Sequence, residues 1–503
     1  MSESVRVELL PLGETFTVEP GGPLQEHLFL RGVEFPCGGR GRCKGCRVKV
    51  LAGETVPTAE ERRLLGEADV AVGWRLACCL RPRTHLKLEL AQWEAAILSD
   101  TSGFAFTPRD GLGVAIDLGT TTIVAQLLDL GTGDVRAVRM ALNSQARHGA
   151  DVMSRIEFAL AGEGQKALES LIRRQLGDLV AELLRSAAAS PAALRDIVLV
   201  GNTVMHHLFC GVSVEPLAHH PFTPSEDGLK QFRPAALGWD LPPGCTVRFL
   251  PCLGGFVGSD MLAGVLATGL HERDSLAVLV DLGTNGEIVA GHRGRLLCAS
   301  TAAGPAFEGA RISMGMRAAT GAISEVTVRE GKLCCRVLGN APARGLCGSG
   351  LVDAVTAGLE LGWIQPSGRL THGAAVVLEP PVSLTQADIR ELQLAKGAIA
   401  AGIRLLLDRL GASLADVARV HLAGAFGNYI NRTSAQRIGL MQFAPERVEP
   451  SGNTALLGAK LALFGLADHD GSFAELRRQI QHVPLNEDPA FHEVYVDLMT
   501  FPS

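Results

Sequence analysis

Two related stretches carry the strongest indication of the fold: Val114-Ala-Ile-Asp-Leu-Gly-Thr-Thr-Thr122 and Val278-Leu-Val-Asp-Leu-Gly-Thr-Asn-Gly286. Each is followed by a later apolar run that ends in a Gly-Asn turn, Ile197-Val-Leu-Val-Gly-Asn202 in the first half and His421-Leu-Ala-Gly-Ala-Phe-Gly-Asn428 in the second. Solenoid repeats have much shorter periods, of about 20–50 residues. The pattern therefore predicts two related lobes, at 111–275 and 276–503. The longer spacing in the second half predicts a subdomain inserted there.

A strand that ends in Asp-x-Gly-Thr predicts a tight hairpin that can bind phosphate. Its backbone N–H groups and hydroxyls suit phosphate oxygens, and its Asp suits a hydrated Mg²⁺. Such hairpins also occur as plain turns, but two copies can grip a triphosphate from both sides. The chain contains no G-x-x-x-x-G-K-[ST] sequence, which argues against the P-loop class. We expect ATP and Mg²⁺ between the two loops, with Asp117 and Asp281 carrying metal and water.

The glycines after the late strand of the second half permit close approach of a flat adenosine, although a structural turn is the alternative. Glu308 is a candidate for positioning water or metal, and an exposed glutamate without a role is the competing interpretation. The predicted ATP-binding residues are Gly119, Thr120, Thr121, Thr122, Gly283, Thr284, Asn285, Gly286, Gly424, Gly427 and Asn428.

Three cysteines lie close together upstream of both loops, in Cys37-Gly-Gly-Arg-Gly-Arg-Cys43-Lys-Gly-Cys46. This C-x5-C-x2-C spacing is close to the plant-type ferredoxin spacing, which holds a [2Fe–2S] cluster with a fourth, later cysteine. Arg75-Leu-Ala-Cys78 matches the position of that last ligand, so we prefer Cys78 to Cys79. A structural zinc site is the alternative, but such sites usually pair two CxxC-like knuckles and only one is present. We predict a [2Fe–2S] cluster on Cys37, Cys43, Cys46 and Cys78.

The pattern around these cysteines predicts a small domain at 1–92, followed by a linker at 93–110. Two hairpin strands, a helix and further strands are the order of a β-grasp domain. The predicted strands are Val5–Leu10, Glu14–Val18, Arg47–Leu51, Trp74–Ala77 and His85–Leu90, and the predicted helices are Leu24–Leu30 and Ala59–Leu65.

Composition limits the classes of function. The chain has 503 residues, a formal net charge of −6 and 12 cysteines. The negative charge gives no electrostatic case for binding nucleic acid or an anionic membrane. We see neither a secretory signal nor a long apolar run, and the cysteines of a long intracellular chain favour metal binding over disulfides. These features predict a cytoplasmic protein.

Together the motifs resemble the ASKHA-type reductive activators of corrinoid proteins. The resemblance rests on the Cys37–Cys46 loop with Arg75–Cys78 and on five segments of the body: Asp117–Thr122, Val200-Gly-Asn-Thr203, Asp281–Glu287, Ala303–Gly309 and Leu422–Asn431. It implies a multidomain α/β and α+β fold, in which a β-grasp [2Fe–2S] ferredoxin domain precedes a duplicated actin/hexokinase-like (ASKHA) body.

The resemblance also implies a function. ATP hydrolysis would drive one electron from the cluster to an inactive Co(II) corrinoid, giving Co(I). The implied partners are a corrinoid protein or cobalamin-dependent methyltransferase and an external electron donor, which could be a ferredoxin, a flavodoxin or a reductase. The oligomeric state stays open, with a homodimer as one option.

Three other functions fit parts of the pattern. An activator of another redox enzyme, such as a radical dehydratase, would hold a [4Fe–4S] cluster between subunits. A small-molecule kinase with a redox-sensing domain would need an acceptor site, for which we see no signature. A nucleotide-gated binding module would release its partner on ATP binding whatever the state of the cluster.

Overall fold

A computed structural model describes residues 4–10, 14–29, 41, 46–90, 106–149, 151–283, 285–309, 311–316, 318, 321–338, 342–371, 373–427, 429–465 and 470–502. The chain forms two compact units. The first holds the described residues up to Gly269 together with Thr454–Ile480. The second holds Leu270–Asn453 and the residues from Gln481 onward.

The N-terminal part of the first unit is a five-stranded mixed sheet in the order β2-β1-β5-β3-β4. β1 and β5 pair in parallel and the other neighbours are antiparallel, which is β-grasp topology. Its strands are β1 (Val5–Leu10), β2 (Glu14–Val18), β3 (Arg47–Ala52), β4 (Trp74–Leu76) and β5 (Leu86–Leu90), and its helices are α1 (Gln25–Phe29), α2 (Ala59–Leu65) and α3 (Glu67–Ala71).

The sequence predicted the bounds of β1, β2 and α2 as the structure has them. The alternation of buried and less buried side chains explains β1, because Val5, Val7 and Leu9 face the core while the residues between them are less buried. A capping box begins α2: Thr58 Oγ1 accepts from the Glu61 backbone N–H, and the Glu61 carboxylate accepts from the Thr58 N–H. The short helix α3 was not predicted.

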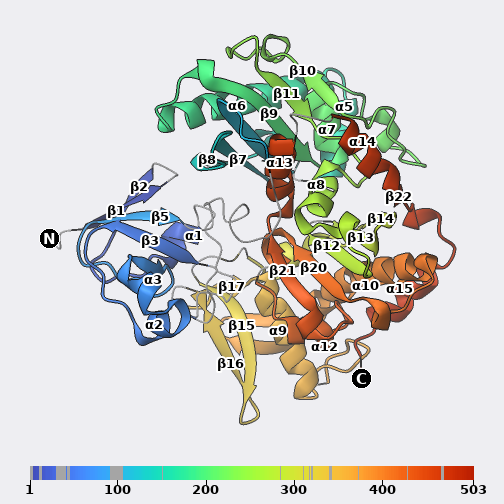
Figure 1. Ribbon diagram of the computed structural model, residues 1–503. Helices are drawn as coiled ribbons and strands as arrows, with labels where there is room; N and C mark the ends of the chain where they lie inside the picture. Colours follow the sequence, from blue (N-terminus) through green and yellow to red (C-terminus); the bar gives the residue numbers. More distant parts are fainter. Residues whose placement is uncertain are drawn as a thin grey trace. The chain divides into compact units, whose positions relative to one another are not determined.

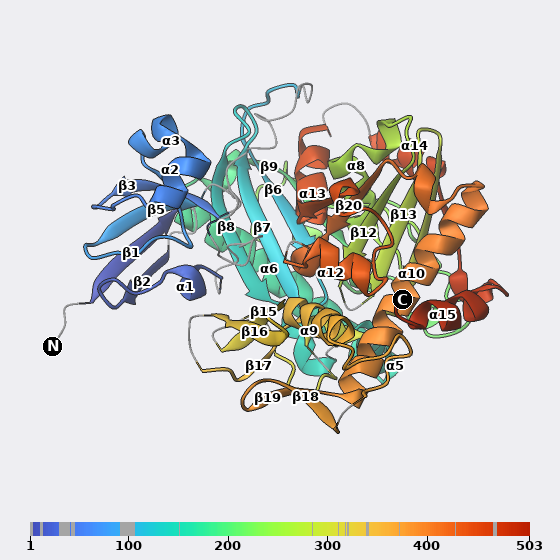
Figure 2. The same cartoon turned by 90° about the horizontal axis from the view of Figure 1, so that it is seen from below.

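The rest of the first unit is built on a six-stranded sheet in the order β10-β11-β9-β6-β7-β8 (Figures 1 and 2). Its strands are β6 (Leu112–Leu118), β7 (Thr122–Asp129), β8 (Val135–Leu142), β9 (Leu194–Gly201), β10 (Lys230–Phe232) and β11 (Thr246–Phe249). Its helices are α5 (Val152–Leu160), α6 (Gly164–Ser186), α7 (Thr203–Cys210), α8 (Ser259–Thr268), α13 (Thr454–Gly465) and α14 (Asp470–Gln479).

Both faces of the central strand β6 are covered. Val114 and Ile116 face a core that α6 lines with residues such as Leu168 and Ile172, which are four positions apart and therefore share one helix face. Gly113 faces the other way, where an added Cβ would lie 2.8 Å from the Leu463 side chain of α13.

The second unit contains a six-stranded sheet in the order β21-β20-β12-β13-β14-β22. Its strands are β12 (Ala277–Leu282), β13 (Gly286–His292), β14 (Arg295–Thr301), β20 (Arg419–Ala423), β21 (Val448–Gly452) and β22 (Ile480–His482). Its helices are α10 (Gln386–Leu410), α11 (Gly424–Gly427), α12 (Arg432–Arg437) and α15 (Phe491–Met499).

The two large sheets confirm the predicted duplication. The order β11-β9-β6-β7-β8 in the first corresponds to β21-β20-β12-β13-β14 in the second. The directions also agree. In each sheet the strand that ends in Asp-Leu forms an antiparallel hairpin with the next strand and pairs in parallel with the later one. Both Asp-Leu-Gly-Thr stretches therefore lie at equivalent hairpins.

The second half carries additional elements between β14 and β20. They form a three-stranded sheet in the order β16-β15-β17, a two-stranded sheet and a helix. These elements are β15 (Ala322–Arg329), β16 (Lys332–Val337), β17 (Gly345–Leu346), α9 (Gly348–Glu360), β18 (Ala375–Glu379) and β19 (Val382–Thr385). They lie where the sequence predicted an inserted subdomain.

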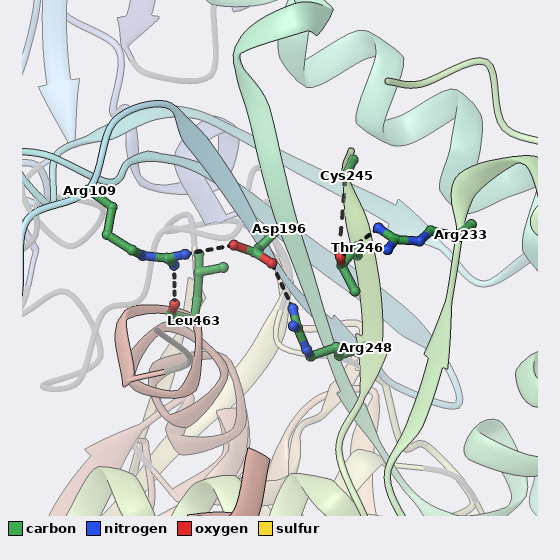
Figure 3. A network of polar contacts seen from close by, with 7 residues as sticks. All are labelled: Arg109, Asp196, Arg233, Cys245, Thr246, Arg248 and Leu463. Atoms are coloured by element: carbon green, nitrogen blue, oxygen red, sulfur yellow. Dashed lines mark hydrogen bonds and ion pairs between the residues drawn. The ribbon is translucent and has the colours of Figure 1, made fainter. Parts of the chain in front are cut away.

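A polar network fixes the start of the first large sheet (Figure 3). Asp196 on β9 accepts from Arg109 at 2.8 Å and from Arg248 on β11 at 2.6 Å. Arg109 also donates to the Leu463 carbonyl at 2.8 Å, near the end of α13. The segment that enters β6 is therefore tied to β9, β11 and α13 by one carboxylate and two guanidinium groups. Most of the predicted linker at 93–110 lies outside the described residues.

Of the helices that the structure describes, none combines the length and the apolar character needed to cross a bilayer.

Candidate functional site

The β-grasp domain brings two of the four predicted cluster ligands together. Cys46 immediately precedes β3 and Cys78 follows β4, and their Sγ atoms lie 3.4 Å apart. Antiparallel pairing of β3 with β4 causes this approach, and the Ala77 N–H donates to the Cys46 carbonyl at 2.9 Å. Both side chains are buried, at 1% and 5% exposed. Cys37 and Cys43 lie outside the described residues.

This thiol pair suits a shared metal. Two thiolates bound to one tetrahedral metal at about 2.3 Å are roughly 3.8 Å apart, close to the separation of this pair. The neighbouring Cys46 thiol raises the pKa of Cys78 to about 12. A metal that binds the thiolates must therefore displace their protons. The donor set fits an iron–sulfur cluster.

Cys79 is placed differently from Cys78. It is half-buried, and its Sγ lies 3.8 Å from that of Cys78. Gly41, the one described residue of the segment between Cys37 and Cys46, is beside it, because a Cβ on Gly41 would lie 3.2 Å from Cys79 Sγ. The contact between Cys46 and Cys78 supports the preference for Cys78 as a ligand, which stays a prediction.

A buried glutamate that sequence reasoning missed supports the turn that carries Cys78. Glu61 is 1% exposed, and its carboxylate accepts from the Leu76 backbone N–H at 2.8 Å as well as from Thr58. Arg81 donates to the Cys78 carbonyl at 3.1 Å. The capping residue of α2 thus also fixes the strand end from which Cys78 emerges.

The first Asp-Gly-Thr loop joins β6 to β7. Asp117 lies in β6 and Thr122 begins β7, while Gly119, Thr120 and Thr121 form the connection and are half-buried. Gly119 is required by close approach, because a Cβ there would lie 2.5 Å from the Thr122 carbonyl oxygen. The hairpin that the motif predicted is therefore confirmed as a backbone structure. Its binding of phosphate stays a prediction.

Every carbonyl of this loop from Gly119 to Thr122 has a donor. The Gly119 N–H donates to the Thr122 carbonyl at 3.1 Å, and the Asn143 backbone N–H donates to that of Thr121 at 2.9 Å. Asn143 Nδ2 donates to the Gly119 carbonyl at 2.9 Å, and Arg155 Nη2 donates to that of Thr120. Sequence reasoning missed Asn143 and Arg155.

Asn202 connects the loop to the end of β9. Its Nδ2 donates to Thr120 Oγ1 at 2.8 Å, while its Oδ1 accepts from the Met205 N–H and caps α7. The Gly-Asn turn that the sequence singled out therefore meets the first loop directly.

The second loop joins β12 to β13 in the second unit. Asp281 lies in β12, Gly286 begins β13, and the Gly283 N–H donates to the Asn285 carbonyl at 3.1 Å. Gly424 has φ of 81° and adjoins Asp281, because a Cβ on Gly424 would lie 2.6 Å from Asp281 Oδ1. The structure thus brings Asp281 and the glycine turn after β20 together.

The remaining predicted residues of the second unit are less closely defined. Gly427 is buried at the end of α11, whereas Thr284 and Asn428 lie outside the described residues. Glu308 is half-buried and ends a 3-10 helix, Pro305–Glu308. Because the two loops belong to different compact units, their facing each other across ATP stays a prediction.

Family models match three parts of the chain. A model of the 2Fe-2S iron-sulfur cluster binding domain matches residues 7–83. A model of the RACo middle region matches 112–273. A model of the C-terminal domain of RACo, the ASKHA domain, matches 275–503.

Individual relatives agree with these matches. The chain is 35% identical to the corrinoid activation enzyme RamQ of Eubacterium limosum over 76% of this chain and 69% of that protein. It is 27% identical to the [Co(II) methylated amine-specific corrinoid protein] reductase of Methanosarcina barkeri over 76% of each protein. A solved structure titled reductive activator for corrinoid, iron-sulfur protein superposes with a TM-score of 0.67 at 26% identity, covering 99% of this chain and 98% of that chain. This chain belongs to the family of the reductive activators of corrinoid proteins.

Proposed function

We propose that this protein carries out ATP-dependent reductive activation of a corrinoid protein. The proposal rests on a combination of features in a chain of this family. A β-grasp domain with the buried thiols of Cys46 and Cys78 3.4 Å apart is joined to two equivalent Asp-Gly-Thr hairpins. The electron acceptor is the inactive Co(II) corrinoid of a corrinoid protein or cobalamin-dependent methyltransferase, which gains one electron and becomes Co(I).

Cys37, Cys43, Cys46 and Cys78 hold the [2Fe–2S] cluster in this proposal. When bound, such a cluster supplies single electrons at a low potential, near about −400 mV for the plant type. The protein keeps Cys46 and Cys78 buried, so their sulfur atoms are shielded from water. An external ferredoxin, flavodoxin or reductase would be the source of these electrons.

ATP binds with Mg²⁺ through the two Asp-Gly-Thr loops. Asp117 and Asp281 are each the last residue but one of a strand, so each presents a carboxylate beside a hairpin with N–H and hydroxyl groups. Gly424 lies against Asp281, because a Cβ there would lie 2.6 Å from Asp281 Oδ1, and the adenosine is proposed to bind beside this glycine turn. Glu308 is proposed to orient water or metal.

ATP assists the reduction only if the ATP-bound protein binds the corrinoid partner differently from the protein without ATP. A ligand shifts an equilibrium between two states only by the difference in its affinity for them. A one-electron potential shifts by about 59 mV for each tenfold change in an equilibrium constant. A coupling of about 5 kcal/mol therefore shifts the effective cobalt potential by roughly 200 mV. Closure of the two lobes that perturbs the cobalt coordination would provide this coupling.

The domain limits proposed for these roles are 1–92, 93–110, 111–275 and 276–503, with an inserted subdomain in the last. We place the protein in the cytoplasm, where thiols stay reduced. In support, none of the cysteines among the described residues forms a disulfide. A homodimer remains one option for its assembly.

The test uses anaerobic protein with its cluster reconstituted, a Co(II) corrinoid protein and a chemical reductant. Visible spectra follow conversion of Co(II) to Co(I) with ATP–Mg²⁺, with ADP–Mg²⁺ and without nucleotide. We expect Co(I) only with ATP, accompanied by phosphate release. Equal Co(I) formation without nucleotide would refute the coupling, and a phosphorylated small molecule as the product would favour the kinase alternative.

A further inference from the structure

We propose that Asn143 and Arg155 are positioning residues, which fix the first Asp-Gly-Thr loop so that the backbone N–H groups of Thr120 and Thr121 point toward the nucleotide phosphates. The inference rests on the proposed ATP site and identifies what shapes it. Neither residue belongs to the motifs that indicated the nucleotide loops. Asn143 follows β8 and Arg155 lies in α5.

The direction of the two N–H groups follows from peptide geometry. In a trans peptide, the carbonyl and the N–H of the next residue point to opposite sides. Asn143 Nδ2 holds the Gly119 carbonyl on the buried side at 2.9 Å, so the Thr120 N–H is turned away from Asn143. Arg155 Nη2 holds the Thr120 carbonyl in the same manner, so the Thr121 N–H is turned away from Arg155.

These two N–H groups are available to a ligand. Neither donates a hydrogen bond to any residue that the structure describes. The Thr120 hydroxyl accepts from Asn202 at 2.8 Å and so retains its own proton as a third donor. Successive backbone N–H groups in a turn form a concave site for anions. The hairpin thus presents three donors and no loop carbonyl that lacks a partner.

The burial of Arg155 requires an explanation, because arginine is rarely buried without a paired anion. The side chain is fully buried, and burial lowers its pKa to about 10. No carboxylate within the described residues forms a salt bridge with it. Its donors go instead to the carbonyls of Thr120 and Gly149 and to Gln145 Oε1 at 3.3 Å. The guanidinium therefore serves the backbone around the loop.

In the equivalent loop of the second unit, the described contacts are at Gly286. Beneath Gly286 lies the apolar side chain of Ile399, 2.6 Å from where a Cβ would be, and Thr301 Oγ1 donates to the Gly286 carbonyl at 3.1 Å. Thr284, the residue equivalent to Thr120, lies outside the described residues.

The test compares Arg155→Met, Arg155→Lys and the control Arg173→Met in the full, cluster-loaded chain. Arg173 is a largely buried arginine of the same lobe that donates to the Phe209 carbonyl at 2.8 Å and pairs with Glu169. Calorimetry measures ATP–Mg²⁺ binding, and hydrogen exchange measures the amides between Leu118 and Ile123 without nucleotide.

We expect Arg155→Met to weaken ATP binding by about 10- to 100-fold, the loss typical of a hydrogen bond from a charged group. Arg155→Lys should recover part of this loss, since it restores a donor. Faster exchange of the loop amides is expected in Arg155→Met but not in Arg173→Met. The visible spectrum should be that of the wild type in all three.

The outcomes distinguish failure of the positioning role from failure of the proposed ATP site. If the wild type binds ATP and Arg155→Met binds it equally well, the positioning role is wrong and the ATP site stands. If the wild type binds no ATP, the proposed nucleotide function fails, and the exchange comparison still decides whether Arg155 fixes the loop. Equal losses in Arg155→Met and Arg173→Met would show only general destabilisation and would refute the inference.

Discussion

Replacing Asp196 by asparagine should destabilise the first lobe strongly, because this carboxylate is shared by two arginines. Arg109 and Arg248 reach its two oxygens at 2.8 and 2.6 Å (Figure 3). The side chains of Asp196, Arg109 and Arg248 are only 11%, 22% and 14% exposed. Asp196→Asn keeps the shape but removes the negative charge, so two guanidinium groups remain close together without it.

The expected magnitude follows from this burial. Breaking a fully buried ion pair by removing one partner costs about 3–5 kcal/mol. Partial exposure allows water to compensate, so the lower end, about 3 kcal/mol, is appropriate. For a unit of about 150–250 residues, each kcal/mol lowers the melting temperature by about 2–4 °C. The first lobe should therefore melt roughly 6–12 °C lower.

The assay follows far-UV circular dichroism for the lobes and visible absorbance for the iron–sulfur domain in the same sample. Lys166→Met is the matched control, since Lys166 pairs with Glu163 at 3.2 Å in the same lobe with both side chains about 80% exposed. Such surface pairs contribute about 0–1 kcal/mol. The visible transition should not move in either variant.

Equal melting temperatures of Asp196→Asn and Lys166→Met would refute the reasoning. They would show that water screens the charges of Asp196, Arg109 and Arg248 as strongly as it screens a surface ion pair. A second variant tests the cause. Replacing all three side chains together, as Arg109→Met, Asp196→Leu and Arg248→Met, should recover much of the loss, because no unpaired charge remains buried.

Two further predictions concern the functional residues, and a third concerns a buried histidine of β20. Cys78→Ser should lose the iron and sulfide of the cluster while Cys79→Ser keeps them, and iron counts with EPR spectra decide it; retention of the cluster in Cys78→Ser alone would make Cys79 the ligand. Asp281→Ala should abolish ATP-coupled Co(II) reduction but leave the cluster spectrum intact, whereas loss of that spectrum would contradict the separation of roles between the domains. His421 on β20 has its pKa lowered by burial from 6.5 to about 4, so the folded chain keeps it neutral while the unfolded chain takes up a proton below about pH 6.5. Stability should therefore fall by up to about 3 kcal/mol between pH 6.5 and 4, and urea unfolding of His421→Gln should show a flatter pH dependence in that window; an unchanged slope would rule His421 out as the cause.

Much of the fold could be predicted because its signals are local. Alternating apolar residues define β1, and the Thr58 capping box defines the start of α2. The Asp-Leu-Gly-Thr repeat predicted equivalent hairpins in both halves, and the paired sheets confirm them. The short helix α3 carries too few residues for a helical period to be recognised, so it was missed.

The sequence by itself determined the fold class, the duplication and the residue types of the site, because strand alternation, turn glycines and cysteine spacing are properties of neighbouring residues. Only the tertiary structure decided which distant groups meet. Cys46 and Cys78 are 32 positions apart, and Arg155 and the Thr120 carbonyl are 35 apart. Strand pairing joins the first two, and a hydrogen bond from Arg155 of α5 joins the others. A buried arginine that supports a backbone carbonyl leaves no periodic trace in the sequence, since its partner is a peptide group that every residue possesses.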